Sequence, residues 1–127
     1  MRNIFLFIAF LILTLPTISS AAVPEITRTQ FCTQIIDHEP GDSPASINIG
    51  LQTLYFFTEI LNGESESISH RWFYNDVQIA DVVLKIGADR WRTWSTKQVW
   101  HLPPGTLKVQ VLDATGTVLI EEGILIE

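Results

Sequence analysis

The sequence predicts an all-β domain, an immunoglobulin-like antiparallel β-sandwich of about seven strands. Three observations favour this architecture. Beyond the N-terminal apolar run, no segment shows a sustained helical period of apolar residues. Short runs rich in β-branched and aromatic residues recur at roughly the 8–12-residue spacing of sandwich strands. The connections between these runs are short, which favours antiparallel neighbours. A small β-barrel is the alternative architecture.

Seven runs are predicted to form strands because each is rich in β-branched or aromatic residues and is bounded by turn residues. They cover residues 26–37, 52–61, 67–74, 77–86, 89–100, 106–112 and 117–126. Asn62-Gly63 and the four residues 113–116 are strong turn signals. The segment 38–46 is interrupted by prolines and a glycine, and it is predicted to be a loop.

The first 22 residues have the layout of a secretory signal peptide. One positive charge precedes an apolar run over 4–15, which a proline ends, and Ser20 and Ala22 fit the small-x-small pattern of a cleavage site. The run is shorter than the roughly 20 apolar residues that span a bilayer. We therefore expect a signal peptide at 1–22 and a single domain at 23–127. Cleavage is preferred to retention as an N-terminal anchor.

The net charge and the cysteine content exclude some classes of function for this protein. The formal net charge is −6, and an acidic surface repels nucleic acid and anionic lipid. The single cysteine, Cys32, cannot form an internal disulfide, so an exported domain must be held together by its core. We expect a periplasmic protein, or a secreted one if it is not retained. We expect no nucleic-acid partner, no cofactor and no stable membrane span after signal cleavage.

Two motifs in the middle of the chain indicate a family. The first is His-Arg-Trp-Phe-Tyr at 70–74, and the second is Arg-Trp-Arg-Thr-Trp-Ser at 90–95, with a tight turn and an aliphatic strand between them. On these motifs the chain resembles DUF2914, bacterial domains of unknown function. The segments 31–40 and 104–119 also resemble the family, although Leu107 stands where a tryptophan is frequent. The resemblance implies export or membrane attachment, and no established activity.

Strand alternation divides each motif between two faces of a sheet, because successive side chains point in opposite directions. In the second motif, one face carries Arg90, Arg92 and Trp94, and the other carries Trp91, Thr93 and Ser95. At most one of these faces can be an exposed site. We expect Trp72 and Trp91 to be core residues because a sandwich often buries a central tryptophan. Cys32 is also expected in the core, since free cysteine behaves as a small buried hydrophobe.

Arg90, Arg92 and Trp94 are the first candidates for a binding surface, with His70 and Arg71 as further candidates. Tryptophan and arginine dominate the hot spots of protein interfaces. We therefore predict an exported interaction or accessory domain that contacts an unknown envelope protein. The alternative is an envelope carbohydrate-binding module, since flat tryptophan faces stack on sugar rings. Packing within the domain competes with both interpretations for most of these side chains.

The sequence contains no strong catalytic motif. His38, His70 and His101 lie far apart and lack the local spacing of a zinc site. Ser95 has no base beside it in sequence. It could meet His70 across strands, but such a contact is more often structural than part of a catalytic triad. A hydrolase is therefore an unfavoured alternative.

Three acidic residues in the predicted loop region are the remaining candidates for a site. Asp37, Glu39 and Asp42 are hard oxygen ligands of the kind that suit Ca²⁺, but their spacing does not match an EF-hand loop. A solvated acidic loop is the preferred interpretation. We predict no metal site.

Overall fold

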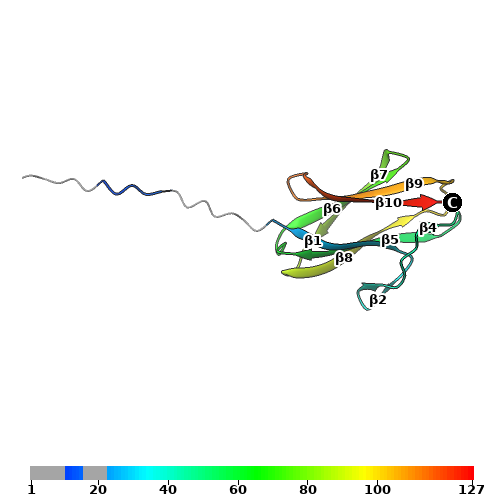
Figure 1. The fold of residues 1–127 in the computed structure, drawn as a ribbon, viewed down its shortest axis with the longest axis horizontal. Helices are drawn as coiled ribbons and strands as arrows, with labels where there is room; N and C mark the ends of the chain where they lie inside the picture. Colours follow the sequence, from blue (N-terminus) through cyan, green and yellow to red (C-terminus); the bar gives the residue numbers. More distant parts are fainter. Residues whose placement is uncertain (1–10, 16–22) are drawn as a thin grey trace, which may run out of the picture.

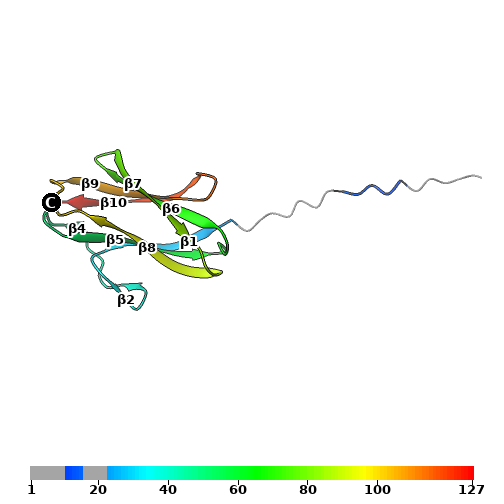
Figure 2. The same cartoon turned by 180° about the vertical axis from the view of Figure 1, so that it is seen from behind.

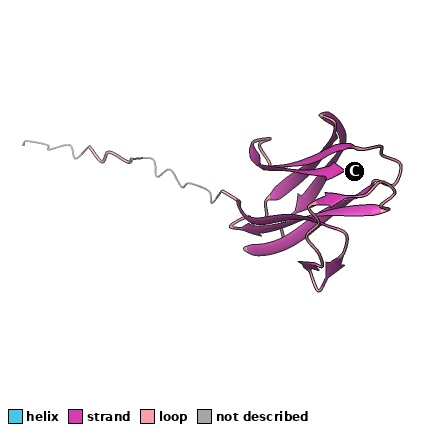
Figure 3. Cartoon of the chain, turned by 45° about the vertical axis from the view of Figure 1, so that its right-hand side comes forward, coloured by secondary structure: helices cyan, strands magenta, loops and turns pink. Residues whose placement is uncertain are grey.

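The computed structural model describes residues 11–15 and 23–127. In this part of the chain, two twisted sheets pack face to face and the connections between strands are turns and loops (Figures 1 and 3). Most of the predicted signal segment, residues 1–10 and 16–22, lies outside the described residues. Neither sheet closes on itself, which confirms the predicted all-β, immunoglobulin-like sandwich in preference to a barrel.

Seven long strands and three two-residue strands form the sheets. The long strands are β1 (Glu25–Cys32), β5 (Thr53–Leu61), β6 (Ser67–Tyr74), β7 (Val77–Lys85), β8 (Arg90–Gln98), β9 (Gly105–Leu112) and β10 (Val118–Ile126). The short strands are β2 (Ile35–Ile36), β3 (Glu39–Pro40) and β4 (Ser46–Ile47). Each predicted strand overlaps one of the long strands.

The chain alternates between the two sheets, as in other sandwiches of this class. One sheet has the order β1-β5-β8, and the other has the order β4-β10-β9-β6-β7. The pairs are antiparallel except for β10 with β4. Figure 2 shows the two layers from behind, with β1, β5 and β8 in one layer and β9 and β10 in the other. The family-like motifs therefore lie in different layers, one on β6 and the other on β8.

The first predicted strand is shorter than expected, and its second half forms a separate hairpin. β1 ends at Cys32, and β2 pairs with β3 across a two-residue turn. Asp37 and His38 form this turn with φ values of 50° and 62°. Two successive left-handed residues are typical of the type I′ turn that suits a tight hairpin. The hairpin projects on the outer side of the three-stranded sheet (Figure 1).

The space between the sheets is filled by aromatic and aliphatic side chains from both. Trp72 on β6 is fully buried, and its ring meets Phe31 at a centroid distance of 6.2 Å and Phe56 at 6.5 Å, both edge-on. Edge-to-face contacts of this kind are a favoured arrangement of aromatic pairs. Leu107 on β9 is also fully buried. A smaller core residue therefore stands where the family frequently has a tryptophan.

Candidate functional site

The strand β8 presents its two faces to different environments. Arg90 and Arg92 are exposed, whereas Trp91 is half-buried and packs against the core cluster, and Ser95 is buried. The predicted alternation of this motif is therefore present in the structure. β8 is also an edge strand, because it pairs only with β5 within the described residues.

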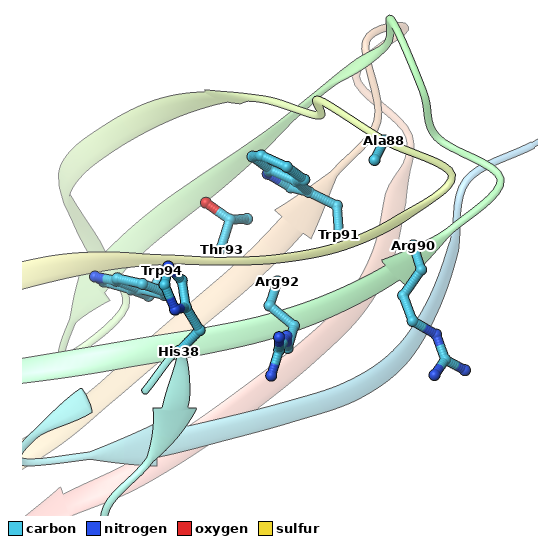
Figure 4. A pocket seen from close by; sticks show the side chains of 7 residues that line it. All are labelled: His38, Ala88, Arg90, Trp91, Arg92, Thr93 and Trp94. Atoms are coloured by element: carbon cyan, nitrogen blue, oxygen red, sulfur yellow. The ribbon is translucent and has the colours of Figure 1, made fainter. Parts of the chain in front are cut away.

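A groove of about 430 Å³ follows the free edge of β8 (Figure 4). Residues 90–94 line it, together with Ala88 from the preceding loop and His38 from the hairpin turn. In Figure 4, Arg90 and Arg92 extend to one side of β8, while Trp91 and Thr93 extend to the other. We call this feature the β8 groove. It collects side chains from both faces because it wraps around an edge strand.

The β2–β3 hairpin closes one end of the β8 groove. His38 lies edge-on to Trp94, with 5.8 Å between the ring centroids. These two side chains also line a second hollow of about 430 Å³, which includes Ile35, Asp37 and Tyr55. The contact between His38 and Trp94 therefore separates two neighbouring hollows on the outer side of the sheet.

Glu39 anchors this hairpin to the sheet through two arginines. Its carboxylate accepts a hydrogen bond from Arg92 at 2.8 Å, and it also forms a salt bridge with Arg28 on β1. Hydrogen bonds from Arg28 and then Arg92 lower the pKa of Glu39 to about 2. Arg28 also lies over the ring of Phe57, 5.0 Å from its centroid. This is a cation–π contact on the outer face of the three-stranded sheet.

Trp72 and Cys32 lie where the sequence prediction places them, among the buried residues, and Trp91 does so only in part. Trp72 and Cys32 have no exposed surface. Burial is the main cause that raises the pKa of the Cys32 thiol to about 11, so this side chain stays a neutral thiol. Trp91 packs against the core cluster and also forms a wall of the β8 groove. Its ring lies so close to Gly87 that a Cβ added there would approach it to 2.9 Å.

The prediction of His70 as a surface contact residue is wrong. His70 is fully buried between the sheets, and Phe56 meets its ring edge-on at 5.2 Å. Alternation placed His70 on the same face as Trp72, and that face of β6 supplies the core. Arg71 does point outward, but it lies on the five-stranded sheet and pairs with Asp81 at 3.3 Å. Neither residue joins the group formed by Arg90, Arg92 and Trp94.

His70 is part of a hydrogen-bond network that crosses the core from β6 to the other sheet. Trp72 Nε1 donates to Ser95 Oγ at 2.9 Å, and Ser95 Oγ lies 2.7 Å from His70 Nδ1. On the other side of the imidazole, Nε2 lies 3.3 Å from Thr58 Oγ1, and that hydroxyl donates to the carbonyl of Thr93 at 3.2 Å.

The network assigns the tautomer of His70 because each hydroxyl has one proton to donate. Thr58 uses its proton on Thr93, so His70 Nε2–H must donate to Thr58. Nδ1 is then unprotonated and accepts the proton of Ser95, whose oxygen accepts from Trp72. Every polar side chain in the network is satisfied when His70 is neutral. Burial alone lowers the pKa of His70 to about 3, which agrees with the neutral form.

The Ser95–His70 pair does not have the arrangement of a catalytic nucleophile and base. Ser95 is 4% exposed and His70 is 0% exposed, so a substrate cannot approach the serine oxygen. A catalytic histidine is oriented by an acid opposite its nucleophile, and here that position is taken by the hydroxyl of Thr58. The pair therefore serves to join the two sheets.

Two of the three acidic residues, Glu39 and Asp42, have partners within the protein. Glu39 binds two arginines, and Asp42 accepts a hydrogen bond from the backbone N–H of Thr33 at 2.7 Å. Among the described residues, no three His, Cys, Asp or Glu side chains gather as a metal-binding group. The same part of the chain contains no helix with the length and apolar character needed to cross a bilayer.

Sequence reasoning missed the contribution of the hairpin to the site. The sequence indicates His38 and Glu39 only as metal-site candidates, yet they contact Trp94 and Arg92 of β8. The available signal was the pair Ile35-Ile36 followed by two turn-tolerant residues, which is compatible with a tight hairpin. It also missed Trp100, which is 56% exposed and lies in a separate hollow with Ile49 and two prolines.

Comparison with known proteins supports the family resemblance and leaves the function open. Residues 65–122 match the family model described as "Protein of unknown function (DUF2914)". The match includes both central motifs and confirms the resemblance, while the segment 31–40 lies outside it. No curated protein matches the sequence.

Among solved structures, the chain is similar to the CARDB domain of a Pyrococcus furiosus protein, described as a complex with di-metal ions. The two are 10% identical, with a TM-score of 0.46, and the similarity covers 85% of this chain and 96% of that one. At this identity and score, the similarity carries no statement about ligands or partners.

Proposed function

We propose that this β-sandwich is a non-catalytic interaction domain. Its residues 65–122 belong to the DUF2914 family, whose function is unknown. Its binding surface is the β8 groove. It acts in the cell envelope after export through the segment 1–22, and residues 23–127 form its single working domain.

The observation that supports this proposal is the composition of the β8 groove. Two tryptophans and two arginines, Trp91, Trp94, Arg90 and Arg92, line one hollow at a free sheet edge. Both residue types dominate the energetics of protein interfaces. The side chains are also held in place, because Trp91 packs against the core and Arg92 is bound by Glu39. A preordered surface loses less conformational entropy when it binds a partner.

A carbohydrate is the second candidate ligand, because two tryptophan side chains line the same hollow. However, Trp91 and Trp94 leave β8 on opposite faces, so their rings do not form one flat platform. The carboxylate of Glu39 is also occupied by two arginines and is not free to bind sugar hydroxyls. These features favour a protein partner over a glycan.

Selection from a displayed library of random peptides, run in parallel with a glycan array, tests the proposal. The full chain, Trp94→Ala and Trp100→Ala are compared. Trp100 is the matched control because it is an exposed tryptophan outside the β8 groove. We expect the chain to select peptides whose binding is lost in Trp94→Ala and kept in Trp100→Ala. Selection of no peptide, or binding unaffected by Trp94→Ala, would overturn the proposal. Glycan binding lost only in Trp94→Ala would support the second candidate.

Export is tested separately by expressing the chain with its own N-terminus in a Gram-negative host. We expect a periplasmic protein whose first residue is Val23, since Ala22 ends the predicted cleavage site. Full-length protein in the membrane fraction would show retention as an anchor. Full-length protein in the cytoplasm would contradict export.

A further inference from the structure

Sheet edges differ in how easily they accept another strand, and β8 is the most open edge in the described part of the chain. The other edges of the two packed sheets are β1, β4 and β7, and the β2–β3 hairpin has only two-residue strands. β1 contains a bulge between Ile26 and Arg28, β4 has only two residues, and β7 pairs with β6 through a bulge. Short length and bulges are devices by which natural proteins block edge pairing.

β8 is neither short nor bulged, and of the devices that block edge pairing it carries only charged side chains. It is nine residues long, contains no proline, and pairs with β5 in unbroken register from Arg90 to Gln98. Alternate residues of an antiparallel edge strand direct both their N–H and C=O groups away from the sheet. A straight edge of this length therefore offers a continuous row of backbone donors and acceptors, and such a row can bind an extended peptide by strand addition.

The charge of β8 indicates what kind of strand it accepts. Three of the eight Lys and Arg residues of the chain, Arg90, Arg92 and Lys97, lie in β8, which contains no Asp or Glu. Within the described residues, neither Arg90 nor Lys97 forms a salt bridge. A second copy of β8 would bring two sets of positive charges together. The edge therefore disfavours self-pairing and attracts a strand that carries carboxylates.

The two sides of the β8 groove would meet alternate side chains of an added strand. Arg90 and Arg92 extend to one side, and Trp91 and Thr93 extend to the other (Figure 4). In an added strand, successive side chains also point to opposite faces. Acidic residues would thus lie beside the arginines, and the intervening apolar residues would lie beside Trp91.

We infer that β8 binds an extended segment of a partner protein in which acidic and apolar residues alternate, and that the segment adds to the three-stranded sheet as a further strand. The inference rests on the proposed function and names the chemistry of the partner.

Three synthetic nine-residue peptides test this inference, matched to the length of β8. One alternates Glu with Val, the second alternates Lys with Val, and the third is the Glu–Val peptide with all its backbone amides N-methylated, which removes the N–H donors from both edges and keeps the charge. Binding to the full chain is measured by fluorescence anisotropy, and amide exchange over residues 90–98 is followed by mass spectrometry. The variant Arg90→Glu/Arg92→Glu is compared with Arg71→Glu, an arginine substitution on the other sheet.

We expect the Glu–Val peptide to bind at least about tenfold more tightly than the Lys–Val peptide, since two ion pairs become two repulsions. It should slow amide exchange in β8, and N-methylation should abolish binding. Arg90→Glu/Arg92→Glu should reverse the charge preference, and Arg71→Glu should not. Because the double variant could be destabilised, binding to the unmodified chain is also measured against salt, where affinity should fall as salt rises.

The outcomes separate this inference from the proposed function. Equal binding of the Glu–Val and Lys–Val peptides would overturn the acidic partner. Equal binding of the N-methylated peptide would overturn strand addition. If library peptides bind through Trp94 while the Glu–Val peptide does not, the inference fails and the proposed function stands. If no peptide binds in either experiment, both fail.

Discussion

The two faces of β8 come from one short sequence but do different things. On the inner face, Ser95 joins His70 and Trp72 across the core, and Trp91 packs beside them against the same cluster. On the outer face, Arg90 and Arg92 are exposed and hold charges that a core could not contain.

This difference changes how the family-like motif is interpreted. Its residues look like one aromatic and basic cluster in the sequence, but with a period of two they form two interleaved sets. The inner set belongs to the fold and requires its partners on β6. The outer set forms the proposed binding surface. Substitutions on the inner face should therefore reduce the free energy of unfolding, and substitutions on the outer face should mainly reduce binding.

The largest effect on stability is expected at the centre of the network. Trp72→Ala should lower the free energy of unfolding by about 3–5 kcal/mol, because it leaves a cavity and removes the hydrogen bond to Ser95. Urea denaturation monitored by circular dichroism measures the change. An unchanged midpoint would contradict the assignment of Trp72 to the core.

Ser95→Ala should cost about 1–3 kcal/mol, since it leaves Trp72 Nε1 without its acceptor in the core. Thr96→Ala is the control, because Thr96 is the next residue on the same strand and its side chain is exposed. A cost for Thr96→Ala as large as that for Ser95→Ala would break the distinction between the two faces.

Stability should depend on pH through His70. Its pKa in the folded protein is about 3, below the ordinary value of 6.5. Below pH 6.5 the unfolded chain therefore binds a proton that the folded protein excludes, so stability is complete above pH 6.5 and falls as the pH decreases toward 3. Between pH 7.5 and pH 5 the loss should be roughly 2 kcal/mol.

His70→Gln should remove this dependence, while His101→Gln should keep it because His101 lies at the surface. The free energy of unfolding of each variant is measured by urea denaturation at several pH values between 5 and 7.5. This range is used because most carboxylates titrate below it. A wild-type slope retained in His70→Gln would show that another group is responsible.

The smallest effect on stability is expected on the outer face. Arg92→Ala removes one partner of Glu39, but the pair is exposed and Arg28 still binds the carboxylate. Exposed ion pairs contribute little, so the urea midpoint should shift by a small fraction of the shift in Trp72→Ala. A shift as large as that of Ser95→Ala would mark Arg92 as a structural residue and weaken its role in binding.

The general plan of the fold could be predicted because it depends on local patterns. Runs such as 52–61 and turns such as Asn62-Gly63 indicate strands and their approximate limits, and each predicted run overlaps one long strand of the structure. The β2–β3 hairpin could not be predicted from local patterns in the same way as the long strands. It depends on Asp37 and His38 adopting left-handed φ angles, and on Glu39 reaching two arginines distant in sequence.

The site was only partly predictable. Arg90, Arg92 and Trp94 were found because their residue types and alternation mark one face of a strand. The prediction for His70 is wrong because it treats His70 apart from Trp72, although alternation puts both on one face of β6 and Trp72 is expected in the core. That face is covered by the three-stranded sheet, which also supplies the hydroxyl groups of Thr58 and Ser95.

The sequence by itself determined that this protein is built of short antiparallel strands, and that its central motif divides into two sets of side chains. Both results follow from the two-residue period of a strand, which is a property of the local backbone. Only the tertiary structure decided which set is buried, because burial depends on the sheet that packs against it. It also decided that Ser95 and His70 form a hydrogen bond across the core, and that β8 lies at an open edge. Strand order and packing bring together residues that no local spacing connects.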